Sequence, residues 1–340
     1  GGIDGKLLKV EIANDDNNPT IAQRVAHRFV QSQNILAVIG HNSSDASVPA
    51  ANIYQAGKLV MISPTSTSPL VTNPENRSAG SYIYRTVIKN DVIAETLAEY
   101  AKKEGKTRVA ICRDSQAKDQ SYEPAIASAL SKNDIQLIDI HCDLAAKNFQ
   151  PEFAIERALK VQANSIFLNP HVDRIDKAIE IAKANQGKLM LFSSHSMQTQ
   201  KTLKAGKAVN GLVMAVSWHT DASANKNFVK DAYKLWNDPN SITWRTANAY
   251  DATNAIAQAL IQKDNTRDGI QQALSGDFAL EGATGTMQFS PWGDRIGTAV
   301  LVEVKPNVKN SNNYSFVLKD SVFNRISLGD KILFQDQNPS

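Results

Sequence analysis

The chain has 340 residues, which is long enough for two domains of ordinary size. Hydrophobic residues make up 42% and charged residues 21% of it, as in a globular protein with a packed core. The formal net charge is only +3, and no cluster of Lys and Arg is interleaved with aromatic residues, so nucleic-acid binding is disfavoured. No apolar run approaches the length of a membrane span.

The amino-terminal third contains a strongly patterned βαβ segment. Residues 6–13 alternate and predict a strand, and Thr20 can cap a helix that runs to about residue 32. Residues 37–39 form a short apolar run closed by Gly40, which is typical of a buried parallel strand. A helix over residues 46–56, capped by Ser44 or Asp45, and a strand over 59–62 complete the unit.

Each of these two strands is followed by a turn rich in small polar side chains. The first turn is 42–45 (NSSD) and the second is 63–69 (SPTSTSP). Neighbouring parallel strands place such turns on the same edge of a sheet, where α/β proteins bind ligands. Hydroxyl groups beside the N–H groups of a helix start suit a small anion such as a carboxylate. One such turn alone is more often an ordinary loop, whereas two in adjacent positions favour a site.

The rest of the chain alternates strands with helices, which predicts α/β architecture with parallel sheets. Three further helical segments then lead into a carboxyl-terminal part made of strands and turns. The predicted strands are 82–87, 108–112, 135–140, 165–168, 188–192, 211–216, 284–289, 299–304, 314–318 and 331–334. The predicted helices are 91–103, 122–131, 153–162, 174–185, 225–236, 247–263 and 267–275.

Polar turns follow five predicted strands, at 42–45, 65–68, 114–122, 169–171 and 193–196. If the two α/β halves face one another, these turns line a single cleft that suits a small ligand. Trp218 follows another strand end and is a further candidate for this cleft. Asp251 is most simply a first-turn acid that favours the helix dipole.

Enzymatic alternatives find little support in the motifs. The chain contains histidines that could act as bases, at His41, His171 and His195. It has no GxSxG nucleophile turn, so a hydrolase is the less favoured class. Neither GxGxxG after a strand nor GxxxxGK[ST] is present, and no metal-ligand spacing is found. We therefore predict no cofactor and no metal. Cys112 and Cys142 lie near the ends of two predicted strands, and buried thiols are somewhat favoured over a disulfide.

Several segments taken together resemble the type I periplasmic binding proteins, and within them the branched-chain amino-acid (Leu/Ile/Val) receptors of ABC transporters. The resemblance rests on GGIDGKLLKVEIANDDNNP, AVIGHNSSDASVPAANIYQAGKLVMISPTSTSP, YIYRTVIKND, RVAICRDSQAKDQSYEPAIAS, KLMLFSSHSM and GATGTMQFSPWGDR. It implies two Rossmann-like lobes with parallel sheets, joined by three crossover strands. Residues 1–86 with 218–295 would form lobe I, and 87–217 with 296–340 would form lobe II.

The resemblance also implies roles for individual residues. Ser44 and Thr67 match the residues whose hydroxyl and N–H groups hold the ligand carboxylate. Thr65 matches the residue whose carbonyl accepts from the ligand ammonium, and Tyr122 matches the aromatic residue that closes over the ligand. The complete set of predicted ligand-binding residues is Asn42, Ser44, Thr65, Ser66, Thr67, Tyr122, Asn169, His195, Ser196 and Trp218.

Two departures from the family pattern matter. Family members that bind amino acids commonly carry Asp or Glu where this chain has His195, and a neutral His gives the ammonium no countercharge. Either another acid serves, with Asp45, Asp119 and Asp251 as candidates, or the ligand lacks an ammonium, as a keto acid does. The chain also starts at the family's second strand and runs past its usual finish, so we expect further segments upstream and a pairing or linker strand within 307–340.

The resulting prediction is a non-enzymatic receptor for a small amino acid or related carboxylate. It would close by a hinge and deliver its ligand to an ABC permease, in the periplasm or anchored to the membrane through flanking segments. The alternative is a sensory domain of the same fold in a larger signalling protein.

Overall fold

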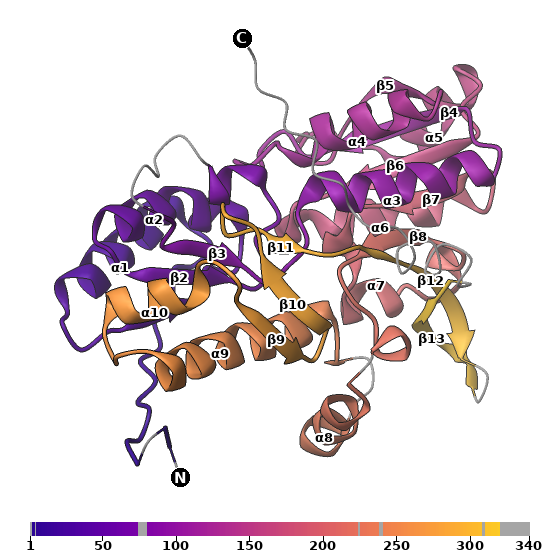
Figure 1. Cartoon of the computed structure of the whole chain (residues 1–340). Helices are drawn as coiled ribbons and strands as arrows, with labels where there is room; N and C mark the ends of the chain where they lie inside the picture. Colours follow the sequence, from indigo (N-terminus) through magenta and orange to yellow (C-terminus); the bar gives the residue numbers. More distant parts are fainter. Residues whose placement is uncertain are drawn as a thin grey trace.

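The computed structural model of the protein describes residues 2–3, 5–73, 80–223, 225–237, 241–307 and 310–319. Its elements form two groups that lie side by side, one built around β1–β3 and the other around β4–β8 (Figure 1). The chain passes from one group to the other between β3 and α3, after β8, and between β11 and β12.

The first group has a three-stranded parallel sheet in the order β1-β2-β3. Met61 and Ile83 pack toward α1 and α2, while Val60, Ile62 and Tyr84 pack toward α9 and α10. Both faces are therefore buried, which explains the continuous apolar runs of these strands. The elements are β1 (Ala37–Ile39), β2 (Val60–Ser63), β3 (Ile83–Arg85), α1 (Pro19–Gln31), α2 (Ser44–Ala56), α9 (Trp244–Gln262) and α10 (Arg267–Leu274). An antiparallel ribbon of β9 (Ala279–Gly282), β10 (Gly285–Phe289) and β11 (Arg295–Ile296) belongs to the same group.

The second group has a seven-stranded sheet in the order β13-β12-β8-β7-β6-β4-β5. Strands β4 to β8 are parallel, and β12 and β13 extend the sheet in antiparallel register. The strands are β4 (Arg108–Arg113), β5 (Gln136–Asp143), β6 (Ser165–Asn169), β7 (Met190–Ser193), β8 (Val213–Val216), β12 (Val300–Asn307) and β13 (Asn310–Leu318). The helices are α3 (Asn90–Lys103), α4 (Tyr122–Lys132), α5 (Pro151–Lys160), α6 (Ile175–Asn185), α7 (Gln200–Leu203) and α8 (Lys226–Trp236).

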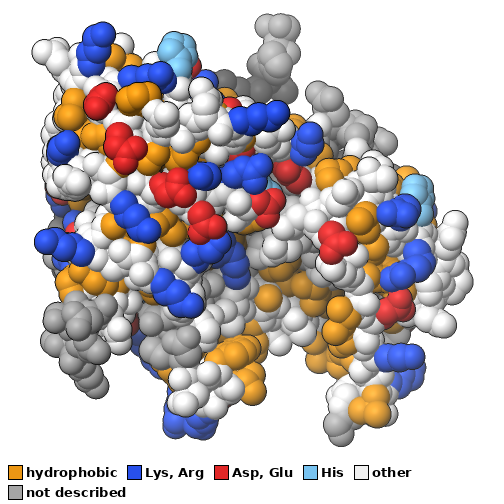
Figure 2. All heavy atoms as spheres, turned by 180° about the vertical axis from the view of Figure 1, so that it is seen from behind, with side chains coloured by type: hydrophobic (Ala, Val, Ile, Leu, Met, Phe, Trp, Pro, Cys, Tyr) orange, Lys and Arg blue, Asp and Glu red, His pale blue; other side chains and the backbone are white. Residues whose placement is uncertain are grey.

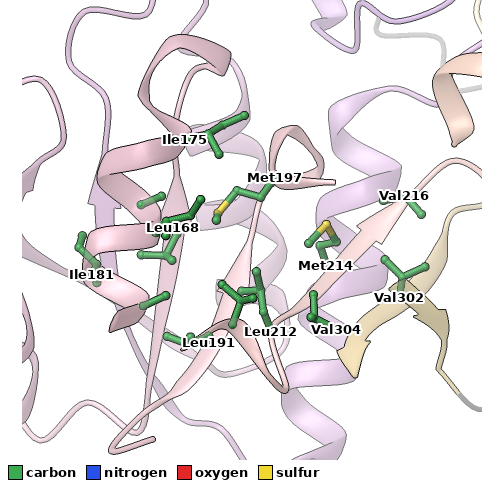
Figure 3. Packing of buried hydrophobic residues seen from close by; sticks show 14 of the residues in the cluster. Leu168, Ile175, Ile181, Leu191, Met197, Leu212, Met214, Val216, Val302 and Val304 are labelled. Atoms are coloured by element: carbon green, nitrogen blue, oxygen red, sulfur yellow. The ribbon is translucent and has the colours of Figure 1, made fainter. Parts of the chain in front are cut away.

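Alternate residues of this sheet supply two separate apolar clusters. Ile111 and Phe167 pack with α3 and α4 on one face. Leu168, Met214 and Val302 pack on the other face with α5 and α6, and Figure 3 shows this second cluster at close range. Because helices cover both faces, the carboxyl-terminal edge of the sheet is left as the natural place for a ligand.

The structure confirms the α/β architecture and most of the predicted elements, and it corrects several details. Residues 7–13 form no strand, and Leu7 and Ile12 are 84% and 90% exposed, since no described strand pairs with this segment. Ser43, and neither Ser44 nor Asp45, is the N-cap residue of α2. Strands β9 and β11 and the short helix α7 were not predicted, whereas the strand predicted at 314–318 is confirmed as part of β13. The strand predicted at 331–334 lies outside the described residues.

The two cysteines form a disulfide, which corrects the preference for free thiols. Cys112 of β4 and Cys142 of β5 are directly paired in the parallel ladder, with Cα atoms 4.6 Å apart. The register shifts between Ile111 and Cys112, where β5 contains two extra residues, and this shift brings the two cysteines opposite each other. No local pattern in the sequence predicts such a shift. A disulfide is typical of proteins that work outside the reducing cytosol.

Candidate functional site

A cleft of about 120 Å³ opens at the carboxyl-terminal edges of both parallel sheets. This edge is where α/β proteins bind their ligands. The turns after β1 and β2 contribute one wall, and the turns after β4, β6 and β7 contribute the other. The first residues of α3 and α9 complete the lining. The lining residues are Asn42, Ser43, Ser44, Asp45, Thr65, Thr67, Asn90, Asp119, Tyr122, Asn169, Pro170, His171, Val172, Ser194, His195, Ser196, Trp244 and Arg245.

The two polar turns of the first wall are held together by their own hydroxyl groups. Thr65 Oγ1 donates to the carbonyl of Asn42 at 2.7 Å, and Ser68 N–H donates to Ser44 Oγ at 3.3 Å. Buried Arg85 at the end of β3 donates to the Ser66 carbonyl at 3.1 Å and pairs with Asp294 at 2.8 Å. The second turn is thus fixed from behind, so that its front can face a ligand.

Thr67 and the second wall are in direct contact. The Thr67 carbonyl accepts from Asn90 N–H of α3 at 2.9 Å, and its Oγ1 lies 3.4 Å from His195 Nε2. These two residues belong to elements of the second group. Thr67 therefore lies where the two walls meet.

Asp45 makes a second bridge across the cleft. Its carboxylate, in the first turn of α2, accepts from the backbone N–H of Lys118 at 3.0 Å and of Asp119 at 2.5 Å. Residues 118 and 119 lie in the loop between β4 and α4 of the second group. Hydrogen bonds to a charged acceptor are stronger than neutral ones, so this contact helps to hold the two walls together.

Three rings form the inner end of the cleft. His195 lies 5.7 Å from Tyr122 and 5.4 Å edge-on from Trp244 between ring centroids. Tyr122 stacks on Phe167 at 5.8 Å and is buried in the cluster under α3 and α4, so its ring is part of the core as well as of the cleft. Burial among these groups, together with the nearby Arg245 charge, lowers the pKa of His195 to about 3.

The structure brings most of the predicted site residues into this cleft. Ser66 does not line it, because its Oγ bonds Ser47 Oγ at 2.7 Å behind the turn. Trp218 does not line it either: it is 3% exposed and packs edge-on against Phe228. The predicted residues that do line it are Asn42, Ser44, Thr65, Thr67, Tyr122, Asn169, His195 and Ser196.

The candidate acids separate in the same way. Asp45 and Asp119 line the cleft, whereas Asp251 is fully buried elsewhere. Asp251 accepts from the N–H of Ala283 at 2.5 Å and pairs with Arg295 at 3.6 Å, which makes it a structural residue of the first group.

Trp244 and Arg245 are the main lining residues that the sequence did not predict. They open α9, whose start was predicted three residues later, and they follow no strand end, which was the signal used for the site. Among the described residues, no group of three or more His, Cys, Asp or Glu side chains is placed to hold a metal ion.

Comparison with known families identifies the architecture. A profile described as "Periplasmic binding protein" matches residues 1–311. The chain belongs to this family. The resemblance noted in the sequence is thereby confirmed, and since the family consists of binding proteins, so is the expectation of a receptor rather than an enzyme. Membership also implies an extracytoplasmic location, and no helix of the described residues is both long and apolar enough to span a membrane.

Relatives within the family include amino-acid receptors. The "Leu/Ile/Val-binding protein homolog 3" of Brucella melitensis is 24% identical over 86% of this chain and 79% of its own length. Across the curated relatives, the matched segments span from 34% to 79% of the relative's length.

Solved structures show the same fold. An ABC transporter substrate-binding protein from Desulfitobacterium hafniense in complex with Leu has a TM-score of 0.77 at 24% identity, covering 93% of this chain and 90% of its own. A solute-binding protein from R. palustris in complex with benzoate has a TM-score of 0.78 at 15% identity, covering 94% of this chain and 87% of its own.

Proposed function

We propose that this chain is the solute-binding protein of an ABC transporter and that it binds a small amino acid or related carboxylate in the cleft between its two lobes. The observation that carries the proposal is the meeting of hydroxyl-rich turns from both sheets at one cleft, with Ser44 and Thr67 beside the start of α2. Helix-start N–H groups and hydroxyl donors are suited to a carboxylate. Family members with this fold are described in complex with Leu and with benzoate, which are both carboxylates.

Binding would proceed by closure of the two lobes around the ligand. Contacts to Thr67 on one wall and to His195 and Tyr122 on the other exist together only when the walls are close. A ligand that touches both walls therefore favours the closed state over the open one. The bridge from Asp45 to the 118–119 loop would form in the same movement.

As part of this proposal, residues 1–86 with 218–295 form lobe I, and 87–217 with 296–340 form lobe II. The sheet assignments on either side of residues 86 and 295 support this division. Trp218, Phe228 and Trp244, however, share one apolar cluster with the seven-stranded sheet, so a hinge motion must either divide this cluster or carry them with lobe II.

The proposed partner is an ABC permease, reached from outside the cytoplasmic membrane. Basic and acidic side chains are interspersed on the face shown in Figure 2, which offers no single-sign surface for nucleic acid. The disulfide supports an oxidising compartment. Attachment of the chain to the membrane through flanking segments is a further part of the proposal, and cell fractionation of the intact protein tests it.

Calorimetric titration of the purified chain with small carboxylates tests the binding proposal. Thr67→Ala is expected to weaken binding by about 1–3 kcal/mol, because a buried ligand oxygen loses its donor. Thr253→Ala is the matched control, since the exposed Thr253 hydroxyl donates to the Ala249 carbonyl within α9, at 2.9 Å, and Thr253 is not among the residues that line the cleft. Equal affinity of the Thr67 variant and the wild type would refute the assignment of this turn to the ligand.

A further inference from the structure

Arg245 brings a positive charge into the cleft without a protein counterion. Its guanidinium lies 4.2 Å above the Trp244 ring and donates one hydrogen bond, from Nη1 to the Gln198 carbonyl at 3.0 Å. Within the described part of the chain, no carboxylate lies within 4.0 Å of it. Burial lowers its pKa to about 10, so the group is still cationic at neutral pH.

The acids that line the same cleft are engaged elsewhere. Both carboxylate oxygens of Asp45 accept loop N–H groups, and Asp119 Oδ1 accepts from Ser121 N–H at 3.1 Å. His195 supplies no negative charge. An ammonium group beside Arg245 would therefore meet a cation and a neutral imidazole, while the cleft carboxylates of Asp45 and Asp119 already accept backbone N–H groups.

Several buried groups that line the cleft have no hydrogen-bond partner among the described residues, and they include donors as well as the acceptor Asn90 Oδ1. Buried Trp244 Nε1 and Tyr122 Oη have no partner among the described residues, and neither does His195 Nδ1. The indole N–H and the guanidinium can only donate, and the phenol and the neutral imidazole can each donate as well. Buried donors without acceptors are costly, so a ligand that supplies acceptor oxygens is favoured here.

We infer that the cleft selects an acid that carries a second oxygen acceptor in place of an ammonium, such as a 2-oxo acid or a dicarboxylate, with Arg245 paired to that second group. This inference rests on the proposed function and names its ligand class. The hydroxyl groups of Ser44 and Thr67 hold the first carboxylate, and Arg245 receives the second oxygen group. A planar guanidinium fork is suited to two oxygen atoms at once.

Calorimetry on the full chain with skeleton-matched pairs tests the inference. The pairs are L-leucine with 4-methyl-2-oxopentanoate, and L-glutamate with 2-oxoglutarate, so that the second pair adds a distal carboxylate. At least one oxo acid is expected to bind tenfold or more tightly than its amino acid. Binding of the amino acid in preference to the oxo acid in both pairs would overturn the inference.

Two variants at Arg245 connect the preference to this side chain. Arg245→Gln is expected to weaken the preferred oxo acid by tenfold or more, and Arg245→Lys is expected to recover part of the loss. Arg24→Gln, a change of the same charge at an exposed position of α1, is the control and is expected to bind as the wild type does. Melting curves of the variants establish that each one is folded.

The failures are distinguishable. If both amino acids bind more tightly and Arg245→Gln binds as the wild type does, while Thr67→Ala loses affinity, the ligand class is wrong and the receptor proposal stands. If none of the four acids binds and none raises the melting temperature, both proposals are overturned.

Discussion

The neutral state of His195 leads to a prediction for the stability of the ligand-free protein. Burial, assisted by the Arg245 charge, lowers the pKa of this imidazole from its ordinary 6.5 to about 3 in the folded chain. Below pH 6.5 the unfolded chain takes up a proton at this position that the folded chain does not. The free energy of unfolding must then fall as the pH is lowered from about 6.5 toward 3. Above pH 6.5 the imidazole is neutral in both states, and no stability is lost through this group.

The size of this effect follows from the two pKa values. At pH 5 an imidazole with a pKa of 6.5 in the unfolded state and about 3 in the folded state costs the protein about 2 kcal/mol relative to pH 7. The other charged or titratable groups that line the cleft with it are Arg245 of α9, Tyr122 of α4, and Asp45, Asp119 and His171. Burial also lowers the pKa of His219, but this histidine is the same in the wild type and in a variant at position 195, so its effect cancels when the two are compared.

The assay is urea unfolding of the wild type and His195→Gln at pH 7 and pH 5. Glutamine cannot titrate, so the loss of stability between the two pH values should be smaller in the variant by about 2 kcal/mol. Any packing defect of the glutamine is present at both pH values and cancels in the comparison. His27→Gln, at an exposed position on α1, is the control and should follow the wild type. An identical loss in the wild type and His195→Gln would refute the burial argument.

Three further substitutions test the roles of the Asp45 bridge, of the Cys112–Cys142 disulfide and of the buried acid Asp251. Asp45→Asn should weaken ligand binding tenfold to a hundredfold by calorimetry while the ligand-free melting temperature changes little, because charge-assisted bonds across the closed cleft are lost; unchanged affinity would refute the bridge. Replacing Cys112 and Cys142 by Ser should cost about 2–4 kcal/mol in urea unfolding with ligand affinity retained, and equal stability would contradict the expected loop constraint. Asp251→Asn should destabilise the chain by about 3 kcal/mol, since Arg295 loses its buried partner; a loss of affinity without a loss of stability would instead place Asp251 in the site.

The sequence alone was sufficient to predict the α/β architecture and one wall of the cleft. The apolar runs ending at Ile39 and Ile62, each followed by hydroxyl-rich turns, are local signals, and parallel pairing necessarily brings their carboxyl ends to one edge. The same reasoning identified Tyr122 and His195, because each follows or lies within a polar turn after a strand. The family resemblance added the expectation that the two α/β halves face each other across one cleft.

Only the tertiary structure decided the remaining features. A run such as 6–13 alternates correctly but forms a strand only if a partner strand lies beside it, and the described residues provide none. Trp218 follows a strand end, which was the signal used to predict ligand-binding residues. Its packing against Phe228 nevertheless places it in the core. Arg245 and Trp244 reach the cleft because α9 returns to it from far along the chain, and no local pattern records such a contact. The proposed ligand class depends on the absence of a carboxylate beside Arg245. The sequence contains many Asp and Glu residues, so only the assembled cleft shows that none of the described ones pairs with this guanidinium.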